Sequence, residues 1–210
     1  PMPLLRPGHV LVRTAATLVS LGTERMLIDF SRAGWLEKAR QQPDKTRQVF
    51  EKIKTDGILS AVEAVRVKLD QPIALGYSNT GRIIESSPEA QATGFSNGDR
   101  VVSNGPHAEF VCAPQNLCAR IPESVGFEAA SFAVVGAIGL QGIRLLQPNL
   151  GEAVVVTGLG LVGLLSAQIL QANGCRVLGI DFDSAKCELA RRFGAETVDL
   201  SRGEDPVAAA

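Results

Sequence analysis

The stretch AVVVTGLGLVG, from Ala153 to Gly163, decides how the second half of the chain folds. A run of β-branched residues precedes three glycines with G-x-G-x-x-G spacing, Gly158, Gly160 and Gly163, and an apolar helical pattern follows them. In a strand-turn-helix unit the first glycine permits the tight turn, the second lets the backbone approach a pyrophosphate, and the third lets the helix pack closely. Unpaired N–H groups at the helix N-terminus then attract an anion. The predicted binding residues of this turn are Gly158, Leu159, Gly160, Leu161, Val162 and Gly163.

An acidic residue follows at the spacing that a ribose-binding carboxylate needs. Asp181 stands at the end of the next predicted strand, 23 residues after Gly158, close to the spacing of about 20 in dinucleotide-binding units. A carboxylate there accepts hydrogen bonds from the ribose hydroxyls and repels a 2′-phosphate, which favours NAD over NADP. Phe182 and Lys186 lie near enough to join the site. The alternatives are a glycine-rich turn that only packs and, for Asp181, a helix N-cap or a surface acid.

The pattern around the glycines alternates between strand and helix. Strands are predicted over 153–157, 176–181 and 196–200, and helices over 127–135, 138–146, 161–172 and 184–193. Such alternation is typical of a parallel, doubly wound sheet. Residues 125–210 are therefore predicted to form the first half of a dinucleotide-binding domain, and both ends of the chain are expected to be cut points of a longer protein.

The first part of the chain has a different pattern of residue types. Short β-branched runs over 10–19, 74–84, 100–103 and 108–113, separated by turn residues such as those of Ser96–Asp99, predict a mainly β domain over residues 1–124. Between about residues 26 and 72, charged residues with apolar ones at helical spacing predict a helical insertion. Its modest basic excess would suit an anionic substrate, but solvated faces of amphipathic helices are the favoured interpretation.

Composition narrows the functional classes. The 210 residues carry a net charge of -1 and 45% hydrophobic residues, so nothing global attracts nucleic acid or an anionic membrane. No run reaches the roughly 18 apolar residues of a membrane span, and no signal-peptide layout opens the chain. Four irregularly spaced cysteines form neither a disulfide framework nor a CxxC zinc site. A cytoplasmic protein that acts on a small molecule is expected.

Several further motifs, in order, resemble the medium-chain dehydrogenase/reductase superfamily. They are PGHVLVRT from Pro7, LGTE from Leu21, LGYSNTGRIIE from Leu75, GFSNGDRVV from Gly94 and AEFVCAP from Ala108. The resemblance implies an α/β plus mainly β fold, in which a GroES-like β domain with a helical insertion precedes a truncated Rossmann doubly wound parallel sheet. The charged insertion resembles a bacterial subgroup that is fused to a second dehydrogenase domain.

The chain departs from the zinc-dependent alcohol dehydrogenases of that superfamily at the metal ligands. Where those enzymes carry zinc ligands, this sequence has Leu21, Tyr77 and Ala137, and their four-cysteine structural lobe is missing. Zinc needs Cys, His or carboxylate ligands at defined distances. We therefore expect no metal site, and a substrate polarised by hydrogen-bond donors, as in zinc-free quinone and enoyl reductases.

Two side chains are candidate catalytic residues. Tyr77 replaces a ligand that points into the cleft of relatives, so its hydroxyl could donate to a substrate carbonyl, although a Tyr bonded to backbone is the favoured interpretation. His107 precedes Ala108, at a position where relatives carry an aromatic residue beside the cofactor cleft. An imidazole can transfer protons, although plain packing is the favoured interpretation.

These observations predict an NAD(H)-dependent oxidoreductase that transfers hydride between nicotinamide and an alcohol or carbonyl substrate. The resemblance to the bacterial subgroup implies a sugar-derived substrate. Two alternatives remain open: an NAD-binding scaffold or regulatory module without catalysis, and an NADPH-dependent quinone or enoyl reductase. A homodimer is a further possibility. Residues 1–210 alone are expected to be inactive, because the half of the domain that holds nicotinamide is missing.

Overall fold

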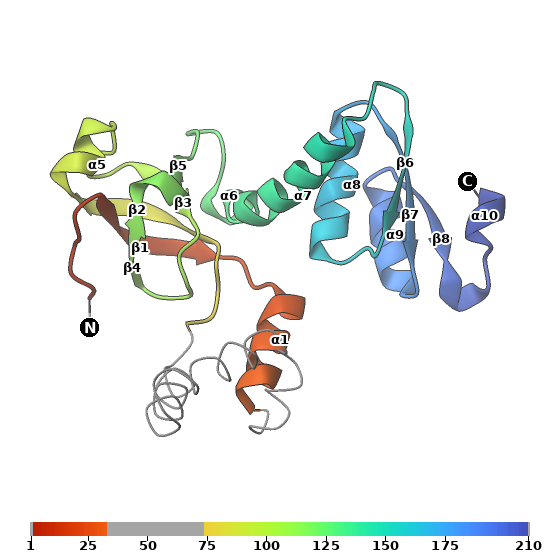
Figure 1. The fold of residues 1–210 in the computed structure, drawn as a ribbon, viewed down its shortest axis with the longest axis horizontal. Coiled ribbons are helices and arrows are strands. Elements are labelled where there is room, and N and C mark those ends of the chain that lie inside the picture. The colour runs from red at the N-terminus through yellow and green to blue at the C-terminus, as the bar shows by residue number, and fades with distance from the viewer. Residues whose placement is uncertain (1, 33–73, 210) are drawn as a thin grey trace, which may run out of the picture. The chain divides into compact units, whose positions relative to one another are not determined.

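A computed structural model of the chain describes residues 2–32 and 74–209, which contain two separate sheets (Figure 1). By contacts the chain divides into two units, residues 1–18 with 77–210, and residues 19–76. The predicted boundary between residues 124 and 125 lies inside the first unit and stays a prediction.

The first sheet is antiparallel and has five strands. They are β1 His9–Thr17, β2 Asn79–Ser86, β3 Arg100–Ser103, β4 Phe110–Pro114 and β5 Cys118–Arg120, in the order β4-β1-β2-β3-β5. Alternate residues such as Val10, Val12 and Val111 point into one apolar core, as the period of two requires. The short helix α5, Pro88–Ala92, begins where the Ser87 hydroxyl accepts a hydrogen bond from the Ala90 N–H. The 3₁₀ turn η1, Gln115–Leu117, joins β4 to β5.

The second sheet is parallel and follows the predicted alternation. Its strands β6 Ala153–Thr157, β7 Arg176–Asp181 and β8 Glu196–Asp199 lie in the order β6-β7-β8. Helices α8 Leu161–Ala172 and α9 Ser184–Arg192 connect them and share one core with the strands, which includes Val177 and Ala190. The 3₁₀ turn η2 Leu200–Arg202 and helix α10 Pro206–Ala209 follow β8. Both sheets agree with the predicted fold class.

Two helices precede the parallel sheet, but their division differs from the prediction. Helix α6 spans Phe127–Ala130 and α7 spans Ala133–Leu146, so the break lies at Ser131 and Phe132 rather than at Gly136. The Ser131 hydroxyl donates to the Glu128 carbonyl, which ends α6, whereas Gly136 is accommodated inside α7. At Gly139 an added Cβ would lie 2.6 Å from the Ser166 hydroxyl oxygen, so this glycine allows α7 and α8 to pack closely.

The unit of residues 19–76 is described in part. Helix α1 spans Leu21–Arg32, so helical structure begins five residues before the predicted insertion. The rest of that predicted insertion, residues 33–72, lies outside the described residues. Across the described ranges, every helix is too short or too polar to cross a membrane.

Candidate functional site

The predicted glycine turn lies between β6 and α8. Gly158 adopts a φ of +84°, a left-handed conformation that favours glycine, and its N–H donates to the Ile180 carbonyl at 2.8 Å. An added Cβ on Gly163 would lie 1.9 Å from the Gly158 carbonyl oxygen. The third glycine is therefore required for the first turn of α8 to pass close to the loop.

Gly160, unlike the crowded Gly163, faces open space. It occupies the N-cap position of α8, no side chain caps that helix end, and a Cβ built on it would meet nothing within 4 Å. The first N–H groups of an α-helix have no partner inside the helix. Open space in front of a helix N-terminus that lacks a capping side chain fits the pyrophosphate of a dinucleotide.

Leu159 joins this turn to the neighbouring strand. Its side chain is fully buried, and a Cβ added to Gly179 of β7 would lie 2.8 Å from Leu159 Cδ2. The Leu159 N–H donates to Asp181 Oδ2 at 2.7 Å. The glycine turn and the acid at the end of β7 are thus held together by a backbone hydrogen bond.

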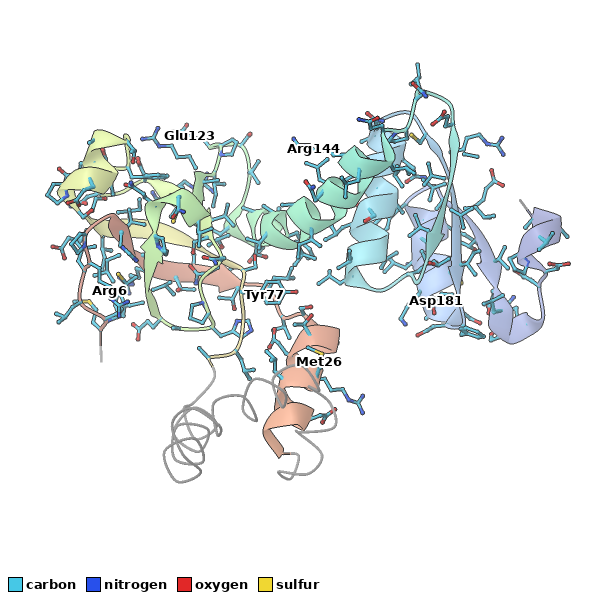
Figure 2. All side chains as sticks on the ribbon, in the orientation of Figure 1. Arg6, Met26, Tyr77, Glu123, Arg144 and Asp181 are labelled. Carbon is cyan, nitrogen blue, oxygen red and sulfur yellow. The ribbon has the colours of Figure 1, made fainter. Side chains whose placement is uncertain are left out.

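The carboxylate of Asp181, which is labelled in Figure 2, has several hydrogen-bond donors and one cation close to it. Its side chain is only 12% exposed, Oδ1 accepts from the Asp183 N–H at 2.9 Å, and Lys186 Nζ lies 3.8 Å from Oδ1. Burial acts to raise the pKa of Asp181, but the hydrogen bonds from Leu159 and Asp183 and the charge of Lys186 outweigh it and lower the pKa below its ordinary value. The group is an anion at neutral pH.

The structure separates Asp181 from the role of helix cap. Asp183 is the N-cap of α9, and its side chain accepts hydrogen bonds from the Ala185 and Lys186 N–H groups. Lys186 Nζ lies 3.7 Å from Asp183 Oδ2 as well, so it sits between two carboxylates. This role of Asp183 was not predicted, although an Asp-Ser pair before a helical run is a typical N-cap signal.

The remaining predicted cofactor residues flank this group. Phe182 follows Asp181 directly and its ring is 73% exposed, whereas Leu161 is half-buried and Val162 exposed in the first turn of α8. An exposed aromatic ring next to a ribose-binding carboxylate offers a flat apolar surface to an adenine ring.

The two predicted catalytic residues lie in the first sheet's connections. Tyr77 precedes β2 (Figure 2) and His107 lies in the loop from β3 to β4, both half-buried. Because Asn79 pairs with Ser103, the start of β2 and the end of β3 are adjacent, which brings both residues to one end of the sheet. Ser78 is not available for chemistry, since its buried hydroxyl donates to the Ser131 carbonyl.

A relay of hydrogen bonds fixes the loop that carries His107. The Asn79 amide donates to Thr14 Oγ1 at 2.7 Å, and that hydroxyl donates to the Ala108 carbonyl at 2.5 Å. A Cβ on Gly105 would lie 2.5 Å from Val111 Cγ1, so the loop also packs tightly against β4. Within residues 2–32 and 74–209, no group of three or more His, Cys, Asp or Glu side chains could hold a metal ion.

Known proteins with similar sequences are dehydrogenases. No protein-family model matches the chain. An alcohol dehydrogenase of Moraxella sp. is 33% identical over 100 residues, which are 47% of this chain and 30% of that enzyme. The alcohol dehydrogenase patD of Aspergillus clavatus is 38% identical over 106 residues, 49% of this chain and 26% of the enzyme.

Solved structures extend the similarity to both sheets. An alcohol dehydrogenase superfamily protein from Novosphingobium aromaticivorans is 26% identical with a TM-score of 0.63, over 96% of this chain and 54% of that one. A mycobacterial protein solved in complex with NADPH is 24% identical with a TM-score of 0.64, over 95% and 52%. The chain thus spans about half the length of these structures. The ordered motifs, the antiparallel and parallel sheets and these relatives together support the resemblance of the chain to the medium-chain dehydrogenase/reductase superfamily.

Proposed function

We propose that the chain binds the adenosine half of NAD(H) and forms part of an NAD(H)-dependent oxidoreductase. The observation that carries the proposal is the hydrogen bond from the Leu159 N–H to Asp181 Oδ2. It places an ionised carboxylate beside a glycine turn whose Gly160 faces open space. A ribose bound there finds an acceptor for its hydroxyls, and a pyrophosphate finds a helix N-terminus.

The chain's own residues provide binding and orientation. Bound nicotinamide would supply hydride chemistry to an alcohol or carbonyl substrate. The N-terminus of α8 would hold the phosphates, Asp181 the ribose, and Phe182 one face of the adenine. Lys186, placed between Asp181 and Asp183, would keep the local charge near balance. A 2′-phosphate would meet the Asp181 charge, which is why we propose NAD rather than NADP.

We propose that the reaction proceeds without a catalytic zinc, because the zinc-ligand positions carry Leu21, Tyr77 and Ala137. Proton donation or substrate polarisation would fall to Tyr77 or His107, which the paired ends of β2 and β3 bring to one end of the sheet. In the whole protein, Tyr77→Phe or His107→Gln should lower kcat by about 100-fold or more if the residue is catalytic. An unchanged Kd for NADH would show that cofactor binding is intact, and an unchanged kcat would remove that residue from the mechanism.

Cofactor choice is tested by titrating the chain with NADH and NADPH in a calorimeter. We expect NADH to bind at least about tenfold more tightly, and Asp181→Ser to reverse the order by removing the repulsion of a 2′-phosphate. Glu188→Gln, an exposed acid on α9, is the matched control and should change neither affinity. Tighter NADPH binding by the unaltered chain would contradict the proposal.

A second candidate is an NADPH-dependent quinone or enoyl reductase. A specific observation favours it, since one of the structural neighbours was solved with NADPH and another is a quinone oxidoreductase from Coxiella burnetii. Assays of NADH and NADPH oxidation with carbonyl, quinone and enoyl substrates distinguish the two in the whole protein. Tight cofactor binding with no turnover on any of them would support a scaffold role instead.

A further inference from the structure

Three arginines form a row across the antiparallel sheet. Arg13 of β1 pairs directly with Arg82 of β2, and Arg82 pairs directly with Arg100 of β3. Residues directly opposite each other on neighbouring strands share one face of the sheet, with Cβ atoms only about 5 Å apart. Like charges in that arrangement repel and destabilise the sheet. The row therefore calls for a compensating negative charge.

Neutral protein groups contact two of the three arginines, Arg100 and Arg82. Arg100 donates to the carbonyls of Pro122, Glu123 and Val125, and its guanidinium lies 4.6 Å from the centre of the Phe127 ring. Arg82 lies 5.8 Å from the same ring and donates one hydrogen bond, to the Gly98 carbonyl. These contacts fix both side chains in place but bring no negative charge.

Arg13 and Arg82 lack a carboxylate partner within the described ranges, in contrast to other arginines. Arg120 is paired with Asp99 at 3.3 Å, Arg176 with Glu196 at 3.5 Å, and Arg202 with Asp199 at 3.2 Å. No ion pair of Arg13 or Arg82 with a described carboxylate lies within 4.0 Å, although both residues are exposed on the sheet. Neither charge is therefore balanced by a described carboxylate.

A hollow of about 340 Å³ lies where these two arginines meet. Arg13 and Arg82 line it together with Ala15, Ile84 and Phe127, and no acidic side chain contributes to the lining. The pairing of β1 with β2 is interrupted at two places, between Leu11 and Val12 and between Thr14 and Ala16. Such irregularities re-aim side chains and occur beside binding sites.

We infer that this arginine hollow is a binding site for the phosphate group of a small phosphorylated molecule. A phosphate monoester carries a charge of about −1.5 to −2 at neutral pH, which balances the two guanidinium groups. Their planar forks donate to phosphate oxygens in pairs. The Phe127 ring and Ile84 supply an apolar wall for the organic part of the ligand. The site is separate from the glycine turn and does not depend on the proposed NAD binding.

Calorimetric titration of the chain with phenyl phosphate, at low ionic strength and with saturating NADH present, tests the inference. We expect saturable binding that weakens with added salt. Arg13→Gln and Arg82→Gln should each lower the affinity by about tenfold or more, because each removes charge-assisted hydrogen bonds. Arg144→Gln, an exposed arginine of α7, is the matched control and should leave the affinity unchanged.

Thermal unfolding gives a second readout that separates binding from misfolding. In phosphate-free buffer, Arg13→Gln should unfold at the same temperature as the unaltered chain or higher, since one repulsive charge is gone. Phenyl phosphate should raise the unfolding temperature of the unaltered chain but not of the variant. The inference is overturned if no saturable binding occurs or if Arg144→Gln weakens binding as much as Arg13→Gln does. It is also overturned if NADH competes with phenyl phosphate, because competition would place the phosphate at the glycine turn.

Discussion

The backbone N–H of Leu159 donates a 2.7 Å hydrogen bond to the carboxylate of Asp181. The same Leu159 anchors its side chain in the core against Gly179 of β7, so one residue ties the glycine turn to the strand that carries the acid. Both halves of the proposed adenosine site are thereby set before any ligand arrives. A preorganised site costs less conformational entropy on binding.

The glycines of the turn give a matched pair of tests. Gly163→Ala should destabilise the fold by about 2 kcal/mol or more, because its Cβ would lie 1.9 Å from the backbone carbonyl of Gly158. A Cβ added at Gly160 would meet nothing within 4 Å. Gly160→Ala should therefore change the free energy of unfolding by less than about 1 kcal/mol. Urea unfolding measures both.

Cofactor affinity should respond to Gly160→Ala even though stability does not. A methyl group there would occupy the space proposed for the pyrophosphate, so NADH affinity should fall by about tenfold or more. Gly136→Ala, also at an open position but inside α7, is the control and should leave NADH affinity unchanged. Equal NADH binding by Gly160→Ala and the unaltered chain would place the cofactor elsewhere.

The ionisation of Asp181 predicts a dependence of stability on pH. Its pKa in the folded chain lies below the ordinary value of 3.8, so its stabilising effect is fully present above that value and is lost as the pH falls through the folded pKa. Unfolding in urea from about pH 7 to about pH 2 measures this loss. Asp181→Asn should show less of the acid-induced decrease, and an identical decrease in both proteins would show that Asp181 is not held as an anion by its neighbours.

Thiol labelling tests the packing of both sheets. Burial raises the pKa of the Cys118 thiol to about 11. Burial together with the Asp199 charge raises the pKa of Cys187, which lies on the buried face of α9. Because the thiolate is the reactive form, iodoacetamide at about pH 8 should modify both at least about 100-fold more slowly than in the urea-unfolded chain. Mass spectrometry of digested samples reports each site separately, and fast labelling of native Cys187 would contradict the described core.

The sequence predicted the parallel sheet better than the rest of the fold. Strand β6, helix α8 and strand β7 begin and end at the predicted residues, because local signals mark each boundary: a β-branched run, three spaced glycines and the Asn173-Gly174 stop. The break between α6 and α7 was misplaced. The sequence placed it between the predicted helices 127–135 and 138–146, but the break is set by the Ser131 hydroxyl and by the long-range bond from Ser78 to the Ser131 carbonyl.

The candidate site was predictable only where its residues are close in sequence. Glycine spacing and the acid 23 residues later are visible in the chain, whereas the Leu159 N–H to Asp181 bond depends on how two strands pair. The arginine row could not be predicted from the sequence, because Arg13 and Arg82 become neighbours only through the register of β1 and β2. The roles of Tyr77 and His107 stay predictions.

The end of α7 offers a stabilising substitution. Gln147 closes the helix in a left-handed conformation with a φ of 51°, the sole non-glycine residue with positive φ among those described. Glycine adopts this conformation without the steric cost of a Cβ. Gln147→Gly should therefore raise the free energy of unfolding by about 0.5 to 1 kcal/mol. Gln141→Gly, at an exposed position inside the same helix, should lower it by about 1 kcal/mol. Urea unfolding of the two variants beside the unaltered chain decides the matter, and a loss of stability at both positions would mean that the helix does not end at Gln147.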